Sequence, residues 1–161
     1  MRVVIYTDGS SRGNPGPGGY GVILISEKGH QKELYGGFRK TTNNRMELLS
    51  VIIGLEALKK PCEVQVFSDS KYVVDAIEKG WLLKWRMTGF AKKKNPDLWK
   101  RYLNVAQNHK VKFDWVKGHA GNEFNERCDK LAVKAALKEN LPADKGYEAS
   151  ENELDFPTQQ G

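Results

Sequence analysis

The sequence predicts an α/β fold in which helices flank one five-stranded mixed sheet. Short apolar runs with the period-two pattern of strands come first, and helical patterns then alternate with further apolar runs. The second and third runs are joined by EKGHQ, which predicts an antiparallel hairpin. Helical crossovers make the first, fourth and fifth strands parallel. The predicted strands are residues 2–8, 20–26, 31–38, 63–70 and 111–119.

The first predicted strand is apolar on both faces and ends in a carboxylate. Val4, Tyr6 and Asp8 alternate on one face, and Ile5 lies on the other. Burial on both faces is expected for the apolar part, but a carboxylate at the tip needs a separate explanation.

The predicted helices lie between and after these strands. TTNNRMELLSVIIGLEALKK predicts a long helix, because Met46, Leu49, Ile53 and Leu58 recur at helical spacing, and Pro61 ends it. Shorter helices are predicted over residues 70–80, over residues 81–108 in pieces broken by KKKNP, and over residues 125–139.

Length and composition predict one globular domain. The 161 residues are 39% hydrophobic and 29% charged, and no run reaches the roughly 18 apolar residues of a membrane span. We expect residues 1–147 to form the domain and residues 148–161 an acidic, flexible tail. The N-terminus lacks the pattern of a secretory signal, which predicts a cytoplasmic protein. Cys62 and Cys128 predict buried reduced thiols, not a zinc site or a disulfide.

The net charge of +6 is unevenly distributed. Residues 139–161 hold six acids and one base, a net charge of −5, so residues 1–138 carry +11. A domain this basic suits a polyanionic partner, with nucleic acid the first expectation and an anionic membrane surface the second.

Four carboxylates lie where predicted elements begin or end. Asp8 and Asp69 close two of the parallel strands, and Glu47 and Asp129 lie in the first turns of two helices. Each has a structural explanation when taken alone: a turn for Asp8, helix capping for Asp69 and Glu47, and a solvated helix charge for Asp129.

The four carboxylates together indicate a metal site. The carboxyl ends of parallel strands share one edge of a sheet, where functional sites assemble. Two unit charges about 4 Å apart repel by ~4 kcal/mol at an effective dielectric constant near 20, so gathered carboxylates need a cation. Oxygen ligands alone favour Mg²⁺ or Mn²⁺ over zinc, and paired divalent ions are one means of phosphodiester cleavage.

Four stretches in register carry a resemblance to a known family. They are YTDGSSRGNPGPGGYG, TTNNRMEL, FSDSKYV and WVKGHAGNEFNERCDKLA. From Arg2 to about Tyr147 the chain resembles the type 1 ribonucleases H, close to the bacterial enzymes. The resemblance implies an RNase H-like fold with a basic helical protrusion over residues 79–101. It also implies endonucleolytic hydrolysis of the RNA strand of RNA/DNA hybrids, leaving 5′-phosphate and 3′-hydroxyl ends.

The resemblance implies a catalytic site that uses two Mg²⁺ ions, with Mn²⁺ as the alternative. Asp8 would bridge both ions, Glu47 and Asp69 would share one, and Asp129 would complete the other. His119 lies in a glycine-flanked loop and would assist proton transfer or product release, a task suited to its pKa range.

The resemblance also implies two kinds of substrate contact. Asparagine amides in the minor groove would read RNA 2′-hydroxyls, and tryptophans and lysines of the protrusion would hold the DNA strand. Lys71 departs from the glutamine of close relatives, and a lysine donates hydrogen bonds but accepts none. The implied substrate-binding residues are Asn14, Thr42, Asn43, Asn44, Lys71, Trp81, Lys84, Trp85, Asn95 and Trp99.

Other interpretations are weighed against this one. The Trp- and Lys-rich segment is alternatively an ordinary amphipathic helix pair, or an interfacial helix at a membrane. A non-catalytic module that binds RNA/DNA hybrids would keep the basic surface without the chemistry. GPGGYG satisfies GxGxxG but leads into a strand, so it does not indicate a dinucleotide site. We expect a monomer that binds an RNA/DNA hybrid and no membrane.

Overall fold

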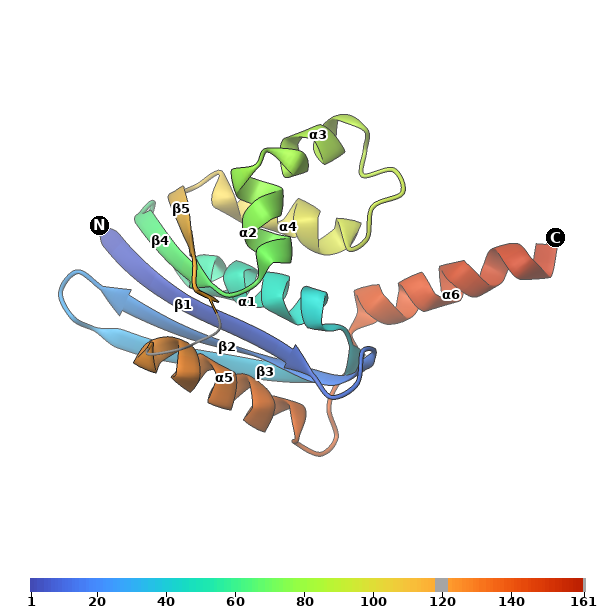
Figure 1. Ribbon diagram of the computed structural model, residues 1–161, viewed down its shortest axis with the longest axis horizontal. Helices are drawn as coiled ribbons and strands as arrows, with labels where there is room; N and C mark the ends of the chain where they lie inside the picture. The colour runs from blue at the N-terminus through green and yellow to red at the C-terminus, as the bar shows by residue number, and fades with distance from the viewer. Residues whose placement is uncertain (118–121, 161) are drawn as a thin grey trace.

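One mixed sheet organises the computed structural model, which describes residues 1–117 and 122–160, with side chains up to residue 152. The strand order is β3-β2-β1-β4-β5, with β2 antiparallel to both neighbours and β1, β4 and β5 parallel (Figure 1). The predicted five-stranded mixed sheet is therefore confirmed. The strands are β1 (Arg2–Ser11), β2 (Gly16–Ser26), β3 (Gln31–Thr41), β4 (Glu63–Ser68) and β5 (Lys110–Trp115).

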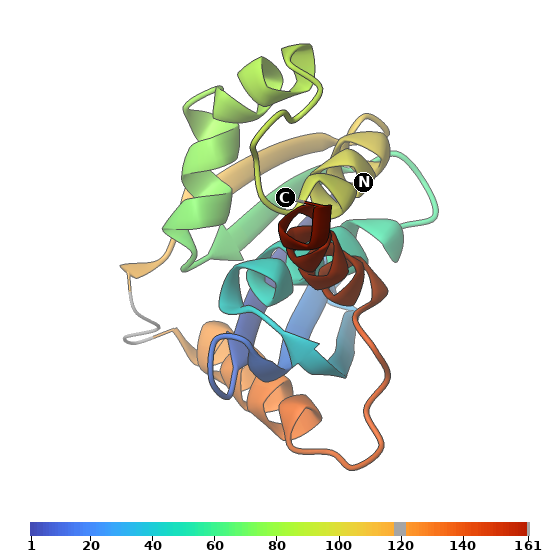
Figure 2. The same ribbon diagram turned by 90° about the vertical axis from the view of Figure 1, so that its right-hand side faces the viewer.

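Helices cover both faces of the sheet. Helix α1 packs on β1 and β2 with α4 against it, and α5 packs on the opposite face across β1, β2 and β3 (Figures 1 and 2). The predicted protrusion, residues 79–101, comprises α3, the loop that leads from it to α4, and the first half of α4. The helices are α1 (Asn43–Glu56), α2 (Lys71–Glu78), α3 (Trp81–Met87), α4 (Pro96–Ala106), α5 (Glu123–Ala136) and α6 (Lys145–Gln160).

Strand β1 is packed on both faces, completely on the side of Ile5 and partly on the side of Val4 and Tyr6. Ile5 is fully buried in the main core with Ile52 of α1. On the other face the ring of Tyr6 stacks on Phe124 of α5 at 4.8 Å and on Phe67 of β4 at 4.9 Å. Because both faces are packed, the backbone of β1 is a rigid support for the carboxylate that it carries.

Several strand boundaries differ from those predicted: β2 begins four residues earlier, at Gly16, β3 ends three residues later, at Thr41, and β4 ends two residues earlier, at Ser68. β1 does not end at Asp8 but continues to Ser11, because Ser10 pairs with Gly19 of β2 and the ladder extends over small residues. β5 ends at Trp115, four residues before its predicted end. The carboxylate of Asp8 thus projects from within a strand and not from a turn.

The end of the chain, where residues 148–161 are predicted to be flexible, is helical from Lys145 and is attached to β3 by two ion pairs. Arg39 Nη2 lies 2.8 Å from Glu148 Oε1, and Lys40 Nζ lies 2.9 Å from Glu151 Oε2. The domain boundary at residue 147 and the flexibility of residues 148–161 stay predictions.

Within the described residues, no helix combines the length and the apolar character needed to cross a membrane.

Candidate active site

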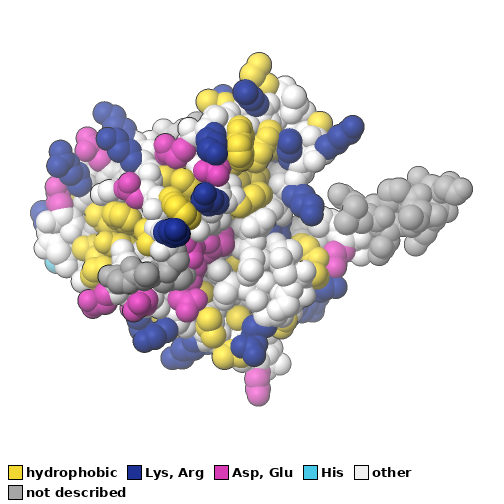
Figure 3. All heavy atoms as spheres, in the orientation of Figure 1, with side chains coloured by type: hydrophobic (Ala, Val, Ile, Leu, Met, Phe, Trp, Pro, Cys, Tyr) yellow, Lys and Arg dark blue, Asp and Glu magenta, His cyan; other side chains and the backbone are white. Residues whose placement is uncertain are grey.

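Three carboxylates from separate parts of the chain meet at the C-terminal edge of the parallel strands. Asp8 comes from β1, Glu47 from the first turns of α1, and Asp69 from the residue after β4. Carboxylate oxygens of the three lie within 4.8 Å of one another. Asp8 is 3% exposed and Glu47 9%. On the face of the molecule that Figure 3 shows, Asp and Glu side chains gather near the middle, below Lys, Arg and hydrophobic side chains.

The structural explanations considered for these three carboxylates are wrong. Asp8 is a ladder residue paired with Gly21, so it makes no turn. The N-cap of α1 is Thr42, whose Oγ1 accepts from the Arg45 N–H. The N-cap of α2 is Ser70, not Asp69. Neither a turn nor helix capping therefore explains the three carboxylates.

A glycine brings β1 into backbone contact with α1. A Cβ atom at Gly9 would overlap the main-chain atoms of Met46 and Glu47. The Gly9 N–H donates to the Glu47 carboxylate. Only glycine permits this approach, which sets Glu47 beside Asp8.

The electrostatics of the cluster suit a divalent cation. Burial, together with the charges of Asp8 and Asp69, raises the pKa of Glu47 well above its ordinary value. A bound cation would reverse this effect, and three carboxylates without a thiol or imidazole form the donor set of a hard ion such as Mg²⁺. The residues present therefore fit a divalent metal.

Glu47→Gln is expected to raise the melting temperature of the metal-free protein at neutral pH. Folding raises the pKa of Glu47, so its contribution to stability is full below its ordinary pKa and is lost as pH rises through the raised pKa. Glutamine keeps the shape without the charge, and each kcal/mol relieved should add about 2–4 °C.

Thermal unfolding with and without millimolar Mg²⁺ measures this effect. Mg²⁺ should raise the melting temperature of the unaltered protein and raise that of the variant less. Glu27→Gln, at an exposed glutamate of the β2–β3 turn, is the matched control and should behave like the unaltered protein. Equal metal-free melting temperatures for Glu47→Gln and the unaltered protein would contradict the inference that the charge of Glu47 destabilises the folded protein.

Of the two remaining predicted catalytic residues, the structure describes only Asp129. Asp129 is half-buried on α5 and is not a member of the group within 4.8 Å. Its neighbour Cys128 is nevertheless close to β1: the thiol donates to the Tyr6 carbonyl at 3.3 Å. Burial and the charge of Asp8 raise the pKa of this thiol. His119, like Gly118 and Gly121 beside it, lies outside the described residues.

The predicted minor-groove asparagines lie where the β1–β2 loop contacts the N-terminus of α1. Asn43 Oδ1 accepts from the Ser11 N–H at 2.7 Å and from the Ser11 hydroxyl at 3.1 Å. Asn14 Oδ1 accepts from the Asn43 N–H at 3.2 Å. Asn44 is exposed beside them. These amides form one polar surface next to the carboxylates.

Arg45 connects α1 to α4 and to the segment before α6. Its guanidinium donates to Asp144 from Nε and Nη2, to Asp97 from Nη1 and Nη2, and to Asn95 from Nη1, at 2.7–3.2 Å. The side chains of Arg45 and Asp144 are 4% and 8% exposed. This buried network was not predicted.

Thr42 and Asn95, predicted to bind a DNA phosphate, are held by internal hydrogen bonds. The Thr42 hydroxyl caps α1, and Asn95 Nδ2 donates to the Tyr72 hydroxyl at 3.0 Å. Each side chain still has one hydrogen to donate, from the Thr42 hydroxyl and from the second position on Asn95 Nδ2.

The tryptophans of the protrusion divide into exposed and buried ones. Trp81 is 41% exposed, with Lys79 Nζ 5.3 Å from its ring centroid, and Trp85 is half-buried beside Lys93. Trp99 is fully buried, and its indole N–H donates to the Tyr72 hydroxyl at 2.9 Å. The predicted substrate contact of Trp99 is therefore corrected: Trp99 supports Trp85, whose ring lies edge-on against it at 5.8 Å.

Replacing Lys92, Lys93 and Lys94 by Ala is expected to weaken hybrid binding and its salt dependence. All three side chains are exposed, and removing one lysine–phosphate pair should reduce the slope of log K against log salt by about 0.9. Titrations in EDTA over a range of salt concentrations measure the slope.

The matched control removes three exposed lysines, Lys28, Lys32 and Lys60, from the opposite edge of the sheet. Its slope should stay that of the unaltered protein. Equal slopes for the two triple variants would rule out the protrusion as a DNA-binding surface.

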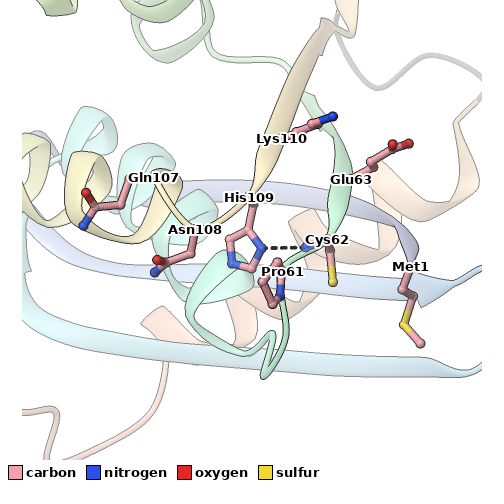
Figure 4. A pocket seen from close by; sticks show the side chains of 8 residues that line it. All are labelled: Met1, Pro61, Cys62, Glu63, Gln107, Asn108, His109 and Lys110. Atoms are coloured by element: carbon pink, nitrogen blue, oxygen red, sulfur yellow. Dashed lines mark hydrogen bonds between the residues drawn. The ribbon is translucent and has the colours of Figure 1, made fainter.

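A separate cavity of about 330 Å³ lies at the N-terminal ends of the parallel strands (Figure 4). His109 Nδ1 accepts there from the Cys62 N–H at 3.1 Å, and burial lowers the pKa of His109. Cys62 and Cys128 are buried free thiols, as predicted. The cavity is at the edge of the sheet opposite to the three carboxylates, so it forms no part of their site.

Comparison with known proteins agrees with this geometry. The RNase H family model matches residues 1–137. The chain is 60% identical over 147 residues to the Ribonuclease H of Desulforamulus reducens, covering 88% of this chain and 92% of the relative. It is 47% identical over 150 residues to the Ribonuclease HI of Synechocystis sp., covering 90% and 94% respectively.

Solved structures show the same fold. LC9-RNase H1, a type 1 RNase H with the type 2 active-site motif, has a TM-score of 0.75 at 34% identity, covering 84% of this chain and 72% of that one. LC11-RNase H1, solved in complex with an RNA/DNA hybrid, has a TM-score of 0.61 at 32% identity, covering 83% and 96% respectively.

The sheet topology and the carboxylate cluster define the class of metal-dependent nucleases that act on phosphodiesters. With the family model matching most of its length, the chain belongs to the RNase H family. The expectation of a type 1 enzyme, an endonuclease that cleaves RNA in RNA/DNA hybrids, is confirmed.

Proposed function

We propose that this chain hydrolyses the RNA strand of RNA/DNA hybrids with two Mg²⁺ ions held by Asp8, Glu47, Asp69 and Asp129. The observation that carries this proposal is the convergence of three carboxylates within 4.8 Å at one edge of the sheet. Asp8, Glu47 and Asp69 would supply carboxylate ligands to the ions, and Asp129 would supply a further one from α5. The ions supply an activated water and charge stabilisation at the leaving oxygen.

The protein residues position the reacting groups. The rigid backbone of β1 fixes Asp8, and the Gly9 N–H orients the Glu47 carboxylate. His119 receives or delivers a proton at the leaving group, a role compatible with an imidazole near neutral pH. The products carry 5′-phosphate and 3′-hydroxyl ends.

The hybrid is recognised through its two different strands. Asn14, Asn43 and Asn44 offer neutral donors and acceptors to RNA 2′-hydroxyls in the shallow minor groove. The internal hydrogen bonds of Asn14 and Asn43 hold these amides in place before substrate binds. Lys71 adds a donor at the same edge of the sheet.

The DNA strand lies on the protrusion. Trp81, Lys84 and Trp85 contact its sugars and phosphates, and Thr42 and Asn95 donate their remaining hydrogens to one phosphate. The complex of LC11-RNase H1 with an RNA/DNA hybrid supports this kind of substrate. We further propose that the protein acts as a cytoplasmic monomer.

Incubation with labelled RNA/DNA hybrid, duplex RNA and duplex DNA, each with and without Mg²⁺, tests the proposal. Only the hybrid should be cut, only in its RNA strand, and only with the metal. A phosphatase-sensitive 5′ end on the products would support the proposed direction of attack. Binding of the hybrid without cleavage in Mg²⁺ or Mn²⁺ would instead favour the non-catalytic module.

A further inference from the structure

Trp115 is a large aromatic residue at the edge of the carboxylate cluster that sequence reasoning did not single out. It is the last residue of β5 and is 42% exposed. Its indole Nε1 donates to the main-chain carbonyl of Asp69 at 3.1 Å. The alternation of β5 places it on the same face as the buried Phe113.

Two hydrogen bonds fix the peptide group between Asp69 and Ser70, one at its carbonyl and one at its N–H. The peptide between Asp69 and Ser70 lies just beyond the last ladder pair, Ser68 with Trp115. Its carbonyl accepts from Trp115, and its N–H donates to Ser68 Oγ at 3.1 Å. Ser68 is 1% exposed. Two side chains thus fix this peptide where the strand ladder has ended.

We propose that Trp115 is a positioning residue for Asp69, and that its indole N–H sets the orientation in which this carboxylate meets a divalent ion. The proposal rests on the metal-binding role of Asp69 in the proposed function. Rotation of the 69–70 peptide changes the ψ angle of Asp69, and the side-chain rotamer that a residue prefers depends on its φ and ψ angles. Groups that orient ligands in this way contribute strongly to metal affinity.

Lys71 covers the outer face of the Trp115 ring. Its Nζ lies 4.6 Å from the ring centroid, and its side chain is exposed. The cation lies over the ring, whereas the hydrogen bond to the Asp69 carbonyl comes from the indole N–H. The roles of the ring and of the N–H can therefore be separated by substitution.

Trp115→Phe keeps an aromatic face for Lys71 and removes only the N–H donor. Calorimetric titration of Mn²⁺ into the protein without nucleic acid should show about tenfold weaker binding than in the unaltered protein. Near-UV circular dichroism checks that the variant is folded. An affinity equal to that of the unaltered protein would overturn the proposal.

Trp81→Phe is the matched control. Trp81 is 41% exposed and also lies under a lysine, but in the described part of the chain its indole N–H has no acceptor. This variant should bind Mn²⁺ like the unaltered protein.

Lys71→Met tests whether a loss of Mn²⁺ affinity in Trp115→Phe arises from a disturbed Lys71 and not from the missing N–H. Removing a cation beside the carboxylates should leave Mn²⁺ affinity unchanged or increase it. Weakening as large as that of Trp115→Phe would overturn the role of the N–H. Failure of the proposed function would show differently, as absent Mn²⁺ binding and absent hybrid cleavage in the unaltered protein, and would overturn both proposals.

Discussion

Asp8→Asn should reduce hybrid cleavage in Mg²⁺ by at least about a thousandfold while leaving hybrid binding within about twofold. Asparagine preserves the size of a side chain that is 3% exposed, and removes the charge that is proposed to bind the ions. Binding depends on the asparagines and the protrusion, which the substitution does not touch. Single-turnover cleavage in Mg²⁺ and titration in EDTA measure the two quantities separately.

Asp75→Asn serves as the control because it removes a carboxylate of α2 that pairs with Lys79 at 3.7 Å, away from the cluster. Its cleavage rate should match that of the unaltered protein. Cleavage by Asp8→Asn within tenfold of the unaltered rate would refute the metal assignment, whatever its effect on binding.

Arg45→Met should lower the free energy of unfolding by about 3–5 kcal/mol, because it leaves the buried Asp144 carboxylate without its cation. Arg45 donates to Asp144 at 2.8 and 2.9 Å and to Asp97 at 2.9 and 2.7 Å, so one substitution removes four charged hydrogen bonds. Urea denaturation at neutral pH measures the loss.

Arg101→Met is the comparison for Arg45→Met. Arg101 makes an equally short pair with Glu56, at 2.6 Å, but both side chains are over one-third exposed. Exposed pairs contribute about 0–1 kcal/mol. Converting both Arg45 and Asp144 to apolar residues should recover part of the loss. Similar losses of unfolding free energy for Arg45→Met and Arg101→Met would show that burial does not increase the contribution of the Arg45 network to stability.

The sheet and the three-carboxylate cluster could be predicted because they follow from local patterns and one topological rule. The apolar alternation of β1 and β4 and the crossover between them place Asp8 and Asp69 at one edge. The spacing of apolar residues in α1 places Glu47 in its first turns. These patterns repeat over many residues, so the prediction does not depend on any single position.

Contacts between distant segments could not be predicted in this way. Asp144 meets Arg45 across 99 positions, and Trp115 meets Asp69 across 46. Phe90, Lys92 and Asn95 have positive φ angles, which residues other than glycine uncommonly adopt. The course of the protrusion loop could therefore not be predicted from its residue types. Trp115 had one visible signal: it is a large aromatic residue two positions after Phe113 in the fifth predicted strand.

The contact of Gly9 with α1 bears on the distance between two proposed metal ligands. Main-chain atoms of a strand and a helix touch there, without an intervening side chain to shorten or lengthen. The spacing between the backbones of two proposed ligands, Asp8 and Glu47, is therefore set by the docking of whole elements. A change in the distance between these two backbones would require a shift of α1 relative to β1.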